Sequence, residues 1–530
     1  MTTVKILVSD KLSSQGLDVL KAAEGVEVDF RTGLSPDELM EAIGEYDGLL
    51  IRSATKVTAE VIAKADNLKV IGRAGIGVDN IDIPAASKRG IVVMNTPTGN
   101  AVTTGEHALS LLLATARHIP RANASMHAGK WEKSKFKGTE LWNKTLGVIG
   151  LGNIGRIVAE RAMGLKMKVI GSDPAVDPAL VADLGVELVE LDDLLARADF
   201  ISVHTPLVAS TRGLFNDETF AKCKDGLILV NAARGGIVEP EALKRALESG
   251  KVSGAALDVF VEEPIPADYP LIGVPGVTLT PHLGASTKEA QDRVSVQIAE
   301  QAVAFLQNGE ITNALNQASL SAEAAVEIAP HLDIGRRLGA LLSQLDNRDS
   351  STLRVTCAGN AAVHGCQPIS DAVAAGYLSG RLGTEVSPMS ARHEAEALNM
   401  SIKGVAESAG AGRATWIRVT LSGGEEIHTA TGAISRSGAA HLIGLGGYEV
   451  DTWLKGVLLV MRNTDEPGVI GAVGSALGKR EINVSRVTVS PDTDAGDALA
   501  LWSLEGDVPE DVLEELRLIE HIQSVQKLTL

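Results

Sequence analysis

The 530-residue sequence has room for roughly three or four domains, and 45% hydrophobic with 3% aromatic residues is typical of packed α/β layers rather than an aromatic-rich β-sandwich. A net charge of −18 argues against a nucleic-acid footprint, because phosphate backbones require clustered cations. The amino terminus lacks a charged segment leading into an apolar run, and no window approaches the roughly 18 apolar residues of a membrane span, so we expect a cytoplasmic protein that binds neither nucleic acid nor membrane.

The cysteine and histidine patterns argue against metal and hydrolase chemistry. Cys223, Cys357 and Cys366 are an odd number of cysteines without C-x-x-C spacing, so the sequence predicts neither a disulfide framework nor a thiolate zinc site. The stretch HEAEA from His393 lacks the second histidine of a helical zinc motif. No G-x-S-x-G nucleophile elbow occurs. We therefore expect no metal site.

The first part of the chain has the pattern of an α/β unit. Apolar runs separated by helical stretches predict parallel strands at residues 4–9, 48–53, 68–74 and 91–95. Ligands of open α/β sheets bind beyond the carboxyl ends of such strands, where loops offer backbone N–H groups and cations. Two of the predicted strand ends carry candidate ligand-binding residues, namely Arg52, Ser53, Arg73 and Gly75. The alternative is a structural turn with solvated arginines.

The strongest local motif follows a strand predicted at residues 145–149. Gly150, Gly152 and Gly155 satisfy the pattern G-x-G-x-x-G. The first glycine permits a tight turn, the second lets the backbone approach a pyrophosphate, and the third allows close helix packing. A helix predicted over residues 153–164 would offer its first N–H groups and its dipole to the phosphates. The sequence therefore predicts a dinucleotide-binding fold.

The next predicted strand, residues 168–171, leads into Ser172 and Asp173. Asp173 can accept hydrogen bonds from both ribose hydroxyls of NAD and would repel the 2′-phosphate of NADP. No arginine follows it in SDPAVDP. NAD is therefore the expected cofactor, unless a residue distant in sequence supplies the missing cation.

Four more strand-like runs, spaced by helices such as residues 239–249, extend the predicted sheet to about residue 286. Polar side chains fall at or just beyond their ends, at Thr205, Arg234, Asp258 and His282. Because the ends of adjacent parallel strands converge on one crevice, residues far apart in sequence become neighbours there.

Taken together, these motifs resemble a known enzyme family. The stretches GLGNIG, HTPL, NAARGGIVE, ALDVFVEEP and PHLGAST resemble the D-isomer-specific 2-hydroxyacid dehydrogenase family, and RSATKVT, GRAGIGVDNID and NTPTGN resemble its D-3-phosphoglycerate-oxidising branch. The resemblance runs from about residue 4 to residue 318. It implies two doubly wound Rossmann-like lobes, one for substrate and one for NAD.

The resemblance also implies the domain boundaries. A substrate domain would be formed by residues 1–97 and 287–318, with an NAD-binding domain of residues 98–286 inserted between them. Residues 319–452 occupy the place of the α+β intervening domain in the long form of this branch. Residues 453–530 would form a ferredoxin-like ACT domain.

Three residues match the family's catalytic positions and suit the oxidation of a 2-hydroxy acid. His282 can take the hydroxyl proton, because its ordinary pKa is about 6.5. Glu263 can bind the second ring nitrogen, which fixes the tautomer and raises the basicity of the ring. Arg234 offers a planar fork to the substrate carboxylate. Pro264 and Pro281 would stiffen the loops that carry the acid and the histidine.

Other residues carried over from the family complete the expected sites. Those expected to bind NAD are Gly150, Gly152, Asn153, Ile154, Gly155, Asp173, Thr205, Ala232, Asp258, Gly284 and Ala285. Those expected to bind substrate are Arg52, Ser53, Arg73, Gly75 and Asn100. Lysines in the loop after residue 128 could add charge to a neighbouring subunit's cleft or simply be solvated: Lys130, Lys133, Lys135 and Lys137.

Several of these assignments have plain structural alternatives. Thr205 and Asp258 could be ordinary strand caps. We expect His107 and His204 to serve packing or local hydrogen bonds rather than catalysis. Ile76 departs from the small polar residue that close relatives often carry there, so no polar contact is assigned to it.

In the carboxyl-terminal third, the sequence pattern is weak up to residue 452 and clear in the tail after it. Residues 325–345 are helical by period, LRVTCAG and TWIRVTLSG are strand-like, and a basic effector pocket around Arg436 and His441 is conceivable. The tail has the order strand, helix, strand, strand, helix, strand of a ferredoxin-like fold and resembles an ACT domain.

In the tail, Pro467 and Gly468 open the first predicted helix, whose amides could receive the carboxylate of an amino acid. The residues expected to bind such an effector are Asn463, Asp465 and Asn483. A domain that serves only to join subunits is the alternative.

The resemblance implies NAD-dependent oxidation of D-3-phosphoglycerate to 3-phosphohydroxypyruvate at the start of serine synthesis. It also implies feedback by L-serine and a homo-oligomer, for which a tetramer is favoured. A glyoxylate or hydroxypyruvate reductase is the alternative within the fold, and an NAD-sensing binding protein is the alternative from another class.

Overall fold

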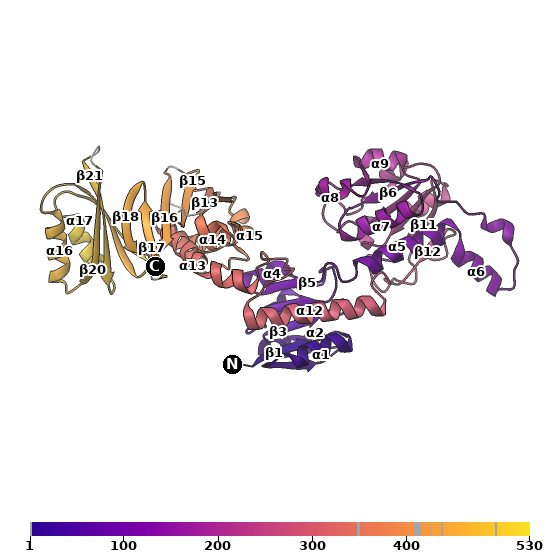
Figure 1. The fold of residues 1–530 in the computed structure, drawn as a ribbon, viewed down its shortest axis with the longest axis horizontal. Helices are drawn as coiled ribbons and strands as arrows, with labels where there is room; N and C mark the ends of the chain where they lie inside the picture. The colour runs from indigo at the N-terminus through magenta and orange to yellow at the C-terminus, as the bar shows by residue number, and fades with distance from the viewer. Residues whose placement is uncertain (1–2, 347–349, 408–414, 425, 436–437, 493–495) are drawn as a thin grey trace.

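The computed structural model describes residues 3–346, 350–407, 415–424, 426–435, 438–492 and 496–530, and four sheets lie within them (Figure 1). They form two α/β lobes, a mixed α+β unit and a ferredoxin-like unit, as the sequence predicted. No helix in these ranges is both long enough and apolar enough to cross a bilayer. The boundaries proposed between the domains stay predictions.

The first sheet has five parallel strands in the order β2-β1-β3-β4-β5. They are β1 (Val4–Val8), β2 (Val26–Phe30), β3 (Gly48–Ile51), β4 (Val70–Arg73) and β5 (Val92–Asn95). All but β2 were predicted. Strand β2 lies at the edge of the sheet and alternates valines with Glu27 and Asp29, so it lacks the continuous apolar run that marks the others.

Helices cover both faces of this sheet. They are α1 (Ser14–Ala22), α2 (Pro36–Ala42), α3 (Ala59–Ala63), α4 (Ile83–Lys88) and α12 (Lys288–Asn308). Leu20 of α1 and Ile298 of α12 share one hydrophobic cluster with Ile6 and Val8 of β1. Helix α12 comes from a segment far along the chain, yet it lies along the first lobe in Figure 1. Two separate segments therefore build this lobe.

The second sheet has seven parallel strands in the order β12-β11-β10-β9-β6-β7-β8. They are β6 (Thr145–Ile149), β7 (Lys168–Ser172), β8 (Glu187–Leu188), β9 (Phe200–Val203), β10 (Leu227–Asn231), β11 (Val252–Leu257) and β12 (Val277–Leu279). The strand order reverses between β6 and β9. In a sheet of this kind the carboxyl ends at such a switch point open onto a ligand crevice.

Helices again flank both faces of the second sheet. They are α5 (Ala101–Ala116), α7 (Asn153–Gly164), α9 (Leu191–Arg197), α10 (Asp217–Lys222) and α11 (Pro240–Glu248). Leu112 of α5 and Val158 of α7 belong to the cluster on one face, whereas Leu194 of α9 and Leu243 of α11 belong to the cluster on the other. Helix α6 (Ile119–His127) and the segment after it reach away from this body in Figure 1.

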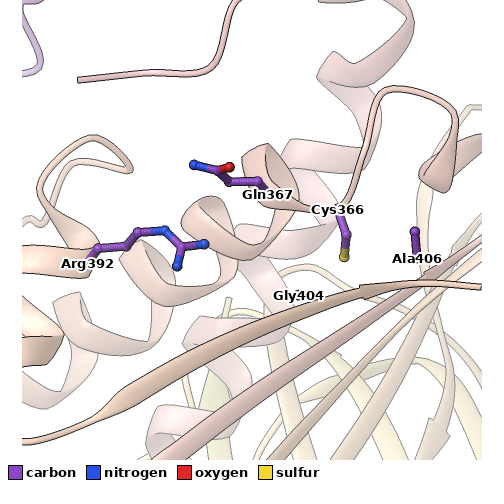
Figure 2. A pocket seen from close by; sticks show the side chains of 5 residues that line it. All are labelled: Cys366, Gln367, Arg392, Gly404 and Ala406. Atoms are coloured by element: carbon purple, nitrogen blue, oxygen red, sulfur yellow. The ribbon is translucent and has the colours of Figure 1, made fainter. Parts of the chain in front are cut away.

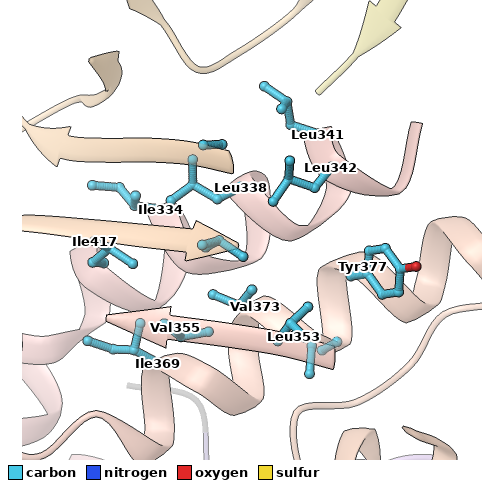
Figure 3. Packing of buried hydrophobic residues seen from close by; sticks show 14 of the residues in the cluster. Ile334, Leu338, Leu341, Leu342, Leu353, Val355, Ile369, Val373, Tyr377 and Ile417 are labelled. Carbon is cyan, nitrogen blue, oxygen red and sulfur yellow. The ribbon is translucent and has the colours of Figure 1, made fainter. Parts of the chain in front are cut away.

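The third sheet is mixed and has the order β14-β13-β15-β16-β17-β18. Its strands are β13 (Thr352–Ala358), β14 (Ser401–Ala406), β15 (Trp416–Ser422), β16 (His428–Ile434), β17 (Ala440–Leu445) and β18 (Tyr448–Trp453). Helices α13 (Ala322–Leu345) and α14 (Gln367–Leu382) pack on it, with the short α15 (Ala391–Ala397) beside them. Figure 3 shows the shared core, where Leu338, Val373 and Ile417 meet.

One expectation about this unit is wrong. The cysteine pattern predicted no disulfide, but Cys357 at the end of β13 is bonded to Cys366 just before α14. The two Cα atoms are 5.8 Å apart, which lies in the ordinary range for a disulfide. The pair was missed because its spacing of nine residues matches no motif, and because only the fold brings the strand end to the helix start.

The last unit has the predicted βαββαβ order. Its elements are β19 (Val457–Thr464), α16 (Val469–Lys479), β20 (Asn483–Asp492), β21 (Asp497–Glu505), α17 (Glu510–Arg517) and β22 (Ile522–Thr529). The sheet is antiparallel between neighbours, in the order β20-β21-β19-β22. Leu459, Trp502 and Leu516 lie in the core between the sheet and the two helices.

Candidate active site

The glycine-rich turn after β6 leaves an open space in front of the helix α7. Gly150 has φ of 88°, and a Cβ there would lie 2.7 Å from the His204 carbonyl oxygen. A Cβ on Gly155 would lie 1.9 Å from the Gly150 carbonyl oxygen, so only glycine lets the helix begin this close to the turn. A Cβ on Gly152 would meet nothing within 4 Å. That combination fits a backbone cradle for a pyrophosphate.

The carboxylate of Asp173 borders this cradle. It follows β7, and its Oδ2 accepts a hydrogen bond of 2.8 Å from the Leu151 N–H, while Oδ1 accepts one of 2.9 Å from the Ala175 N–H. Asn153 and Ile154 begin α7. These contacts hold an acceptor at the end of β7, where the ribose hydroxyls of a dinucleotide are recognised in folds of this kind.

Asp258 is a buried anchor for the loop that carries His282. Its Oδ1 accepts hydrogen bonds from Thr280 (2.6 Å) and from the Leu283 N–H (2.8 Å), and its Oδ2 accepts one from the Gly284 N–H (2.8 Å). His107 Nε2 lies 3.1 Å from Oδ1. Burial alone would raise the pKa of Asp258, but the hydrogen bonds from His107, Thr280 and Leu283 bring the pKa below its ordinary value.

The carboxylate of Asp258 holds protein groups, and its assignment to the NAD site stays a prediction. Its contact with His107 agrees with the expectation that His107 makes local hydrogen bonds. His204 also makes a local hydrogen bond, as expected, because its Nε2 lies 2.7 Å from Ser202 Oγ. Thr205 donates its hydroxyl to the Pro206 carbonyl at 3.1 Å, and Ala232 is buried beyond β10.

Glu263 and His282 are brought together by the fold. His282 Nδ1 lies 2.7 Å from Glu263 Oε2, and Glu263 Oε1 accepts a hydrogen bond of 2.9 Å from the Phe260 N–H. With the carboxylate ionised and the ring neutral, Nδ1 donates to Glu263 and Nε2 keeps its lone pair, because an ionised carboxylate only accepts hydrogen bonds. The side chain of His282 is 49% exposed, so this nitrogen can reach a ligand. His282 also has φ of 55°, an uncommon conformation that often accompanies a functional site.

Arg234, which follows β10, reaches the loop after β4 of the first lobe. Its Nε and Nη2 each lie 2.9 Å from Asp79 Oδ2, and its Nη1 donates to the Ala233 carbonyl at 2.7 Å. A Cβ on Gly77 would lie 1.9 Å from Arg234 Nη2, so a larger residue there would displace the guanidinium. Asp79 therefore holds the orientation of a candidate catalytic arginine across the two lobes.

The predicted substrate residues lie on the first-lobe side of this crossing. Arg73 Nε donates to Asn80 Oδ1 at 3.2 Å, and the Arg52 N–H donates to Asp10 Oδ2 at 2.6 Å. Burial and, after it, the neighbouring positive charge of Arg234 lower the pKa of Arg73 to about 10. The three arginines thus form one cationic cluster.

The uncharged members of the predicted substrate set lie in loops after β3 and β4 and at the start of α5. Gly75 has φ of 146° and donates its N–H to Thr96 Oγ1 at 2.8 Å. Asn100 is buried, and its Oδ1 has no hydrogen-bond partner among the described residues. A buried amide oxygen of this kind is costly unless a ligand satisfies it. Ser53 is exposed beside Arg52.

Sequence reasoning missed Asp79. The sequence did contain a clue to Asp79, because this residue lies in a glycine-rich loop that follows a strand ending in Arg73, where ligand-binding residues are expected. A carboxylate in such a loop is easily assigned to solvent. Only the pairing of the two lobes shows that it meets Arg234.

The predicted effector residues are not all brought together within one chain. Asn463 pairs with Ala498 at the start of β21, whereas Asn483 pairs with Glu505 at its end. At about 3.3 Å per residue the two positions lie roughly 23 Å apart along the sheet. Asp465 follows β19 and donates its N–H to the Gly496 carbonyl.

Two other expectations concern charged groups outside the central crevice. All four lysines of the loop after α6 are exposed, and Lys135 pairs with Glu132 at 2.6 Å. His441 Nδ1 lies 2.9 Å from Asp451 Oδ1, and its ring meets Trp453 with centroids 4.2 Å apart. Arg436 lies outside the described residues. Within those residues, no three His, Cys, Asp or Glu side chains gather in a way that could hold a metal ion.

The comparisons with known proteins agree with this architecture. Residues 109–284 match the NAD-binding domain of D-isomer-specific 2-hydroxyacid dehydrogenases, residues 327–446 match the D-3-phosphoglycerate dehydrogenase intervening domain, and residues 457–519 match the ACT domain. A D-3-phosphoglycerate dehydrogenase of Synechocystis sp. is 38% identical over 98% of this chain and 94% of its own length. One of Archaeoglobus fulgidus is 39% identical over 98% of both chains.

A solved structure shares the first two lobes. The crystal structure of a glyoxylate reductase from Paecilomyes thermophila covers 59% of this chain and 99% of its own, at 30% identity and a TM-score of 0.56.

Proposed function

Because the chain belongs to the D-3-phosphoglycerate dehydrogenase family, we propose that it oxidises D-3-phosphoglycerate to 3-phosphohydroxypyruvate with NAD, the first step of the phosphorylated route to serine. The observation that carries the proposal is the His282–Glu263 pair, with Nδ1 and Oε2 2.7 Å apart. This pair lies on the lobe whose Arg234 crosses to the cationic cluster of the first lobe.

Each of the three residues has one task in the oxidation. His282 Nε2 takes the proton from the C2 hydroxyl of the substrate. Glu263 holds the ring by Nδ1 and stabilises the imidazolium that forms. Arg234 binds the substrate carboxylate through the N–H groups that Asp79 and Ala233 leave free. When bound on the glycine-rich turn, NAD supplies the hydride acceptor.

The first-lobe cations fit the phosphate of the substrate. Arg52 and Arg73 lie with Arg234 in one cluster, and an incoming phosphate relieves their mutual repulsion. The buried Oδ1 of Asn100 can accept a hydrogen bond from a substrate hydroxyl. A reductase of unphosphorylated glyoxylate would have no use for this cluster, so the cluster favours the phosphorylated acid.

We also propose that the ACT domain binds L-serine between two copies of the chain. Asn463 and Asn483 lie at opposite ends of β21, so a site that uses both must combine residues from two chains. Asp465 would meet the ammonium group of the effector. The same argument supports a homo-oligomer, for which we propose a tetramer in the cytoplasm.

The test is the oxidation of NADH by the purified chain with 3-phosphohydroxypyruvate, with and without L-serine. Rapid turnover is expected, and His282→Gln should abolish it while leaving NADH binding intact. Arg52→Ala should raise KM for the phosphorylated acid but not for unphosphorylated hydroxypyruvate, whereas Lys56→Ala should change neither.

Turnover of glyoxylate at the rate of the phosphorylated acid would contradict the substrate assignment. Serine-independent turnover would contradict the effector assignment alone. An NADH-dependent protein complex without turnover would instead favour an NAD-sensing binding protein.

A further inference from the structure

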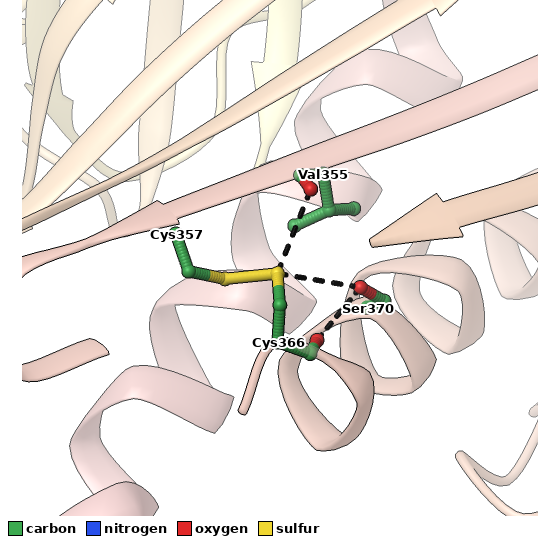
Figure 4. Close-up of a disulfide and its surroundings, with 4 residues drawn as sticks. All are labelled: Val355, Cys357, Cys366 and Ser370. Atoms are coloured by element: carbon green, nitrogen blue, oxygen red, sulfur yellow. Dashed lines mark hydrogen bonds between the residues drawn. A yellow bond between two sulfur atoms is a disulfide. The ribbon is translucent and has the colours of Figure 1, made fainter. Parts of the chain in front are cut away.

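The disulfide of the third unit lies beside an open pocket. Cys366 Sγ, bonded to Cys357, lies 3.5 Å from the Val355 carbonyl oxygen and 3.7 Å from Ser370 Oγ (Figure 4). The pocket has a volume of about 470 Å³, and Figure 2 shows the side chains around it. It is lined by Cys366, Gln367, Arg392, Gly404 and Ala406.

The pocket exists because the edge strand β14 carries its smallest residues next to the disulfide. In the register with β13, Gly404 lies beside Val355 and Ala406 lies beside Cys357. Alternate residues of neighbouring strands share a face, so these two lie on the same face as the disulfide. A Cβ on Gly404 would lie 2.6 Å from Ser370 Oγ, so a larger residue would require the Ser370 side chain to move. The small residues of β14 therefore leave the space beside Cys366.

The two sulfur atoms differ in their accessibility. Cys357 is 0% exposed in β13, whereas Cys366 is 7% exposed and contributes to the pocket wall. Cys366 is also the residue immediately before α14, a helix of 16 residues. Cys366 is thus the sulfur that borders the pocket from which an external thiol would approach.

A cation lies at the same pocket. The guanidinium of Arg392, on α15, reaches toward the side on which Gln367 and Cys366 lie (Figure 2). Its Nε lies 2.7 Å from Asp371 Oδ1, but these two atoms are not aligned for a hydrogen bond. With its side chain 41% exposed, Arg392 can hold a second carboxylate through its outer nitrogens.

We propose that Cys366 is a site of reversible S-thiolation by a small thiol that carries a carboxylate. The incoming thiolate attacks Cys366 Sγ and forms a mixed disulfide there. The Cys357–Cys366 bond breaks, and its electron pair leaves on Cys357 Sγ, which takes a proton from solvent. A second thiolate attacks the outer sulfur of the mixed disulfide, which releases Cys366 as a thiolate and the small thiol as its own disulfide.

The net exchange turns the protein disulfide and two small thiols into a protein dithiol and one small disulfide. Disulfides in a reducing cytoplasm are transient rather than permanent, which agrees with a reactive pair at an open pocket. The inference goes beyond the dehydrogenase reaction and does not depend on it. The third cysteine gives an internal reference, since burial raises the pKa of the Cys223 thiol to about 11 and makes it unreactive.

The first test maps the products by mass spectrometry. The full chain, purified without reductant, is treated with 3-mercaptopropionate, quenched in acid and alkylated. The mixed disulfide is expected on Cys366 and the alkyl group on Cys357, with Cys223 unmodified until the chain is denatured. A mixed disulfide on Cys357, or a Cys357–Cys366 bond that never forms in air, would overturn the proposal.

Single-cysteine variants make the test independent of the bond itself. In Cys357→Ala, the Cys366 thiol should react with the disulfide of 3-mercaptopropionate at least tenfold faster than the Cys357 thiol in Cys366→Ala. Equal rates in two variants with native circular dichroism would overturn the assignment of Cys366.

The last test probes Arg392. Arg392→Gln should slow exchange with 3-mercaptopropionate roughly two- to fivefold, as expected for a partly exposed ion pair, and leave exchange with neutral 2-mercaptoethanol unchanged. Arg354→Gln on the other face of β13 is the matched control and should affect neither thiol. A loss of rate that is equal for both thiols in Arg392→Gln would overturn the role of the carboxylate.

Discussion

The pairing of Asp79 with Arg234 gives a sharp prediction. Asp79→Asn removes the negative charge but keeps the shape of a residue whose Oδ2 lies 2.9 Å from both Nε and Nη2 of Arg234. Hydrogen bonds to charged groups contribute about 1.5–3 kcal/mol. Because the Asp79 side chain is 62% exposed, solvent screening reduces this to about 1–2 kcal/mol. The variant should therefore lose roughly five- to thirtyfold in kcat/KM.

The loss should fall on kcat. A guanidinium that turns away from its place no longer binds the substrate carboxylate beside His282, whereas Arg52 and Arg73 still hold the phosphate. The assay is steady-state NADH oxidation with 3-phosphohydroxypyruvate as the varied substrate. Asp66→Asn is the matched control, because Asp66 forms an exposed ion pair with Arg89 on the same lobe.

A second variant tests the same geometry without removing a charge. Gly77→Ala places a Cβ where Arg234 Nη2 lies and should displace the guanidinium, with a comparable loss in kcat. A kcat within twofold of the parent in both variants would refute the positioning role of Asp79. A rise in KM without a fall in kcat would also refute this role, because it would mean that Asp79 contributes to substrate affinity alone.

Three further outcomes are expected. Burial lowers the pKa of His204 to about 4 from an ordinary 6.5, so the unfolded chain takes up a proton at a higher pH than the folded chain. The free energy of unfolding, measured from urea midpoints, should therefore drop by about 2 kcal/mol between pH 7.5 and 5. This drop should be lost in His204→Gln and kept in the exposed control His393→Gln. Gly155→Ala, whose Cβ would lie 1.9 Å from the Gly150 carbonyl oxygen, should abolish NADH binding in a fluorescence titration, and near-parental affinity would contradict the cradle. Asp173→Ala should weaken NADH binding and improve NADPH binding, so that an unchanged ratio of the two dissociation constants would count against the ribose assignment.

Much of the architecture could be predicted because it depends on local periodicity. The glycine motif, the helix α7 and the βαββαβ order of the tail each follow from residues adjacent in sequence. Strand β2 was missed because it alternates valines with acidic residues and lacks the continuous apolar run by which the other strands were recognised. The pairing of Glu263 with His282 was predicted from chemistry and a family resemblance, and the fold brings the two within hydrogen-bond distance.

The features that could not be predicted from the sequence depend on contacts between segments that are distant along the chain. Asp79 meets Arg234 because two lobes face each other, and no periodicity encodes that meeting. The Cys357–Cys366 bond depends on a strand end that meets a helix start. The distance between Asn463 and Asn483 depends on the strand order of the last sheet, which was not deduced from the residues.

The return of α12 to the first lobe has a consequence for biosynthesis. Until residues 288–308 leave the ribosome, the face of the first sheet that includes Ile6 and Val8 lacks the helix that completes its cover. The NAD lobe, by contrast, is contiguous in sequence and can close on itself earlier. The nascent chain should therefore mature its inserted lobe before its first one, with an exposed apolar surface in the interval that chaperones would recognise.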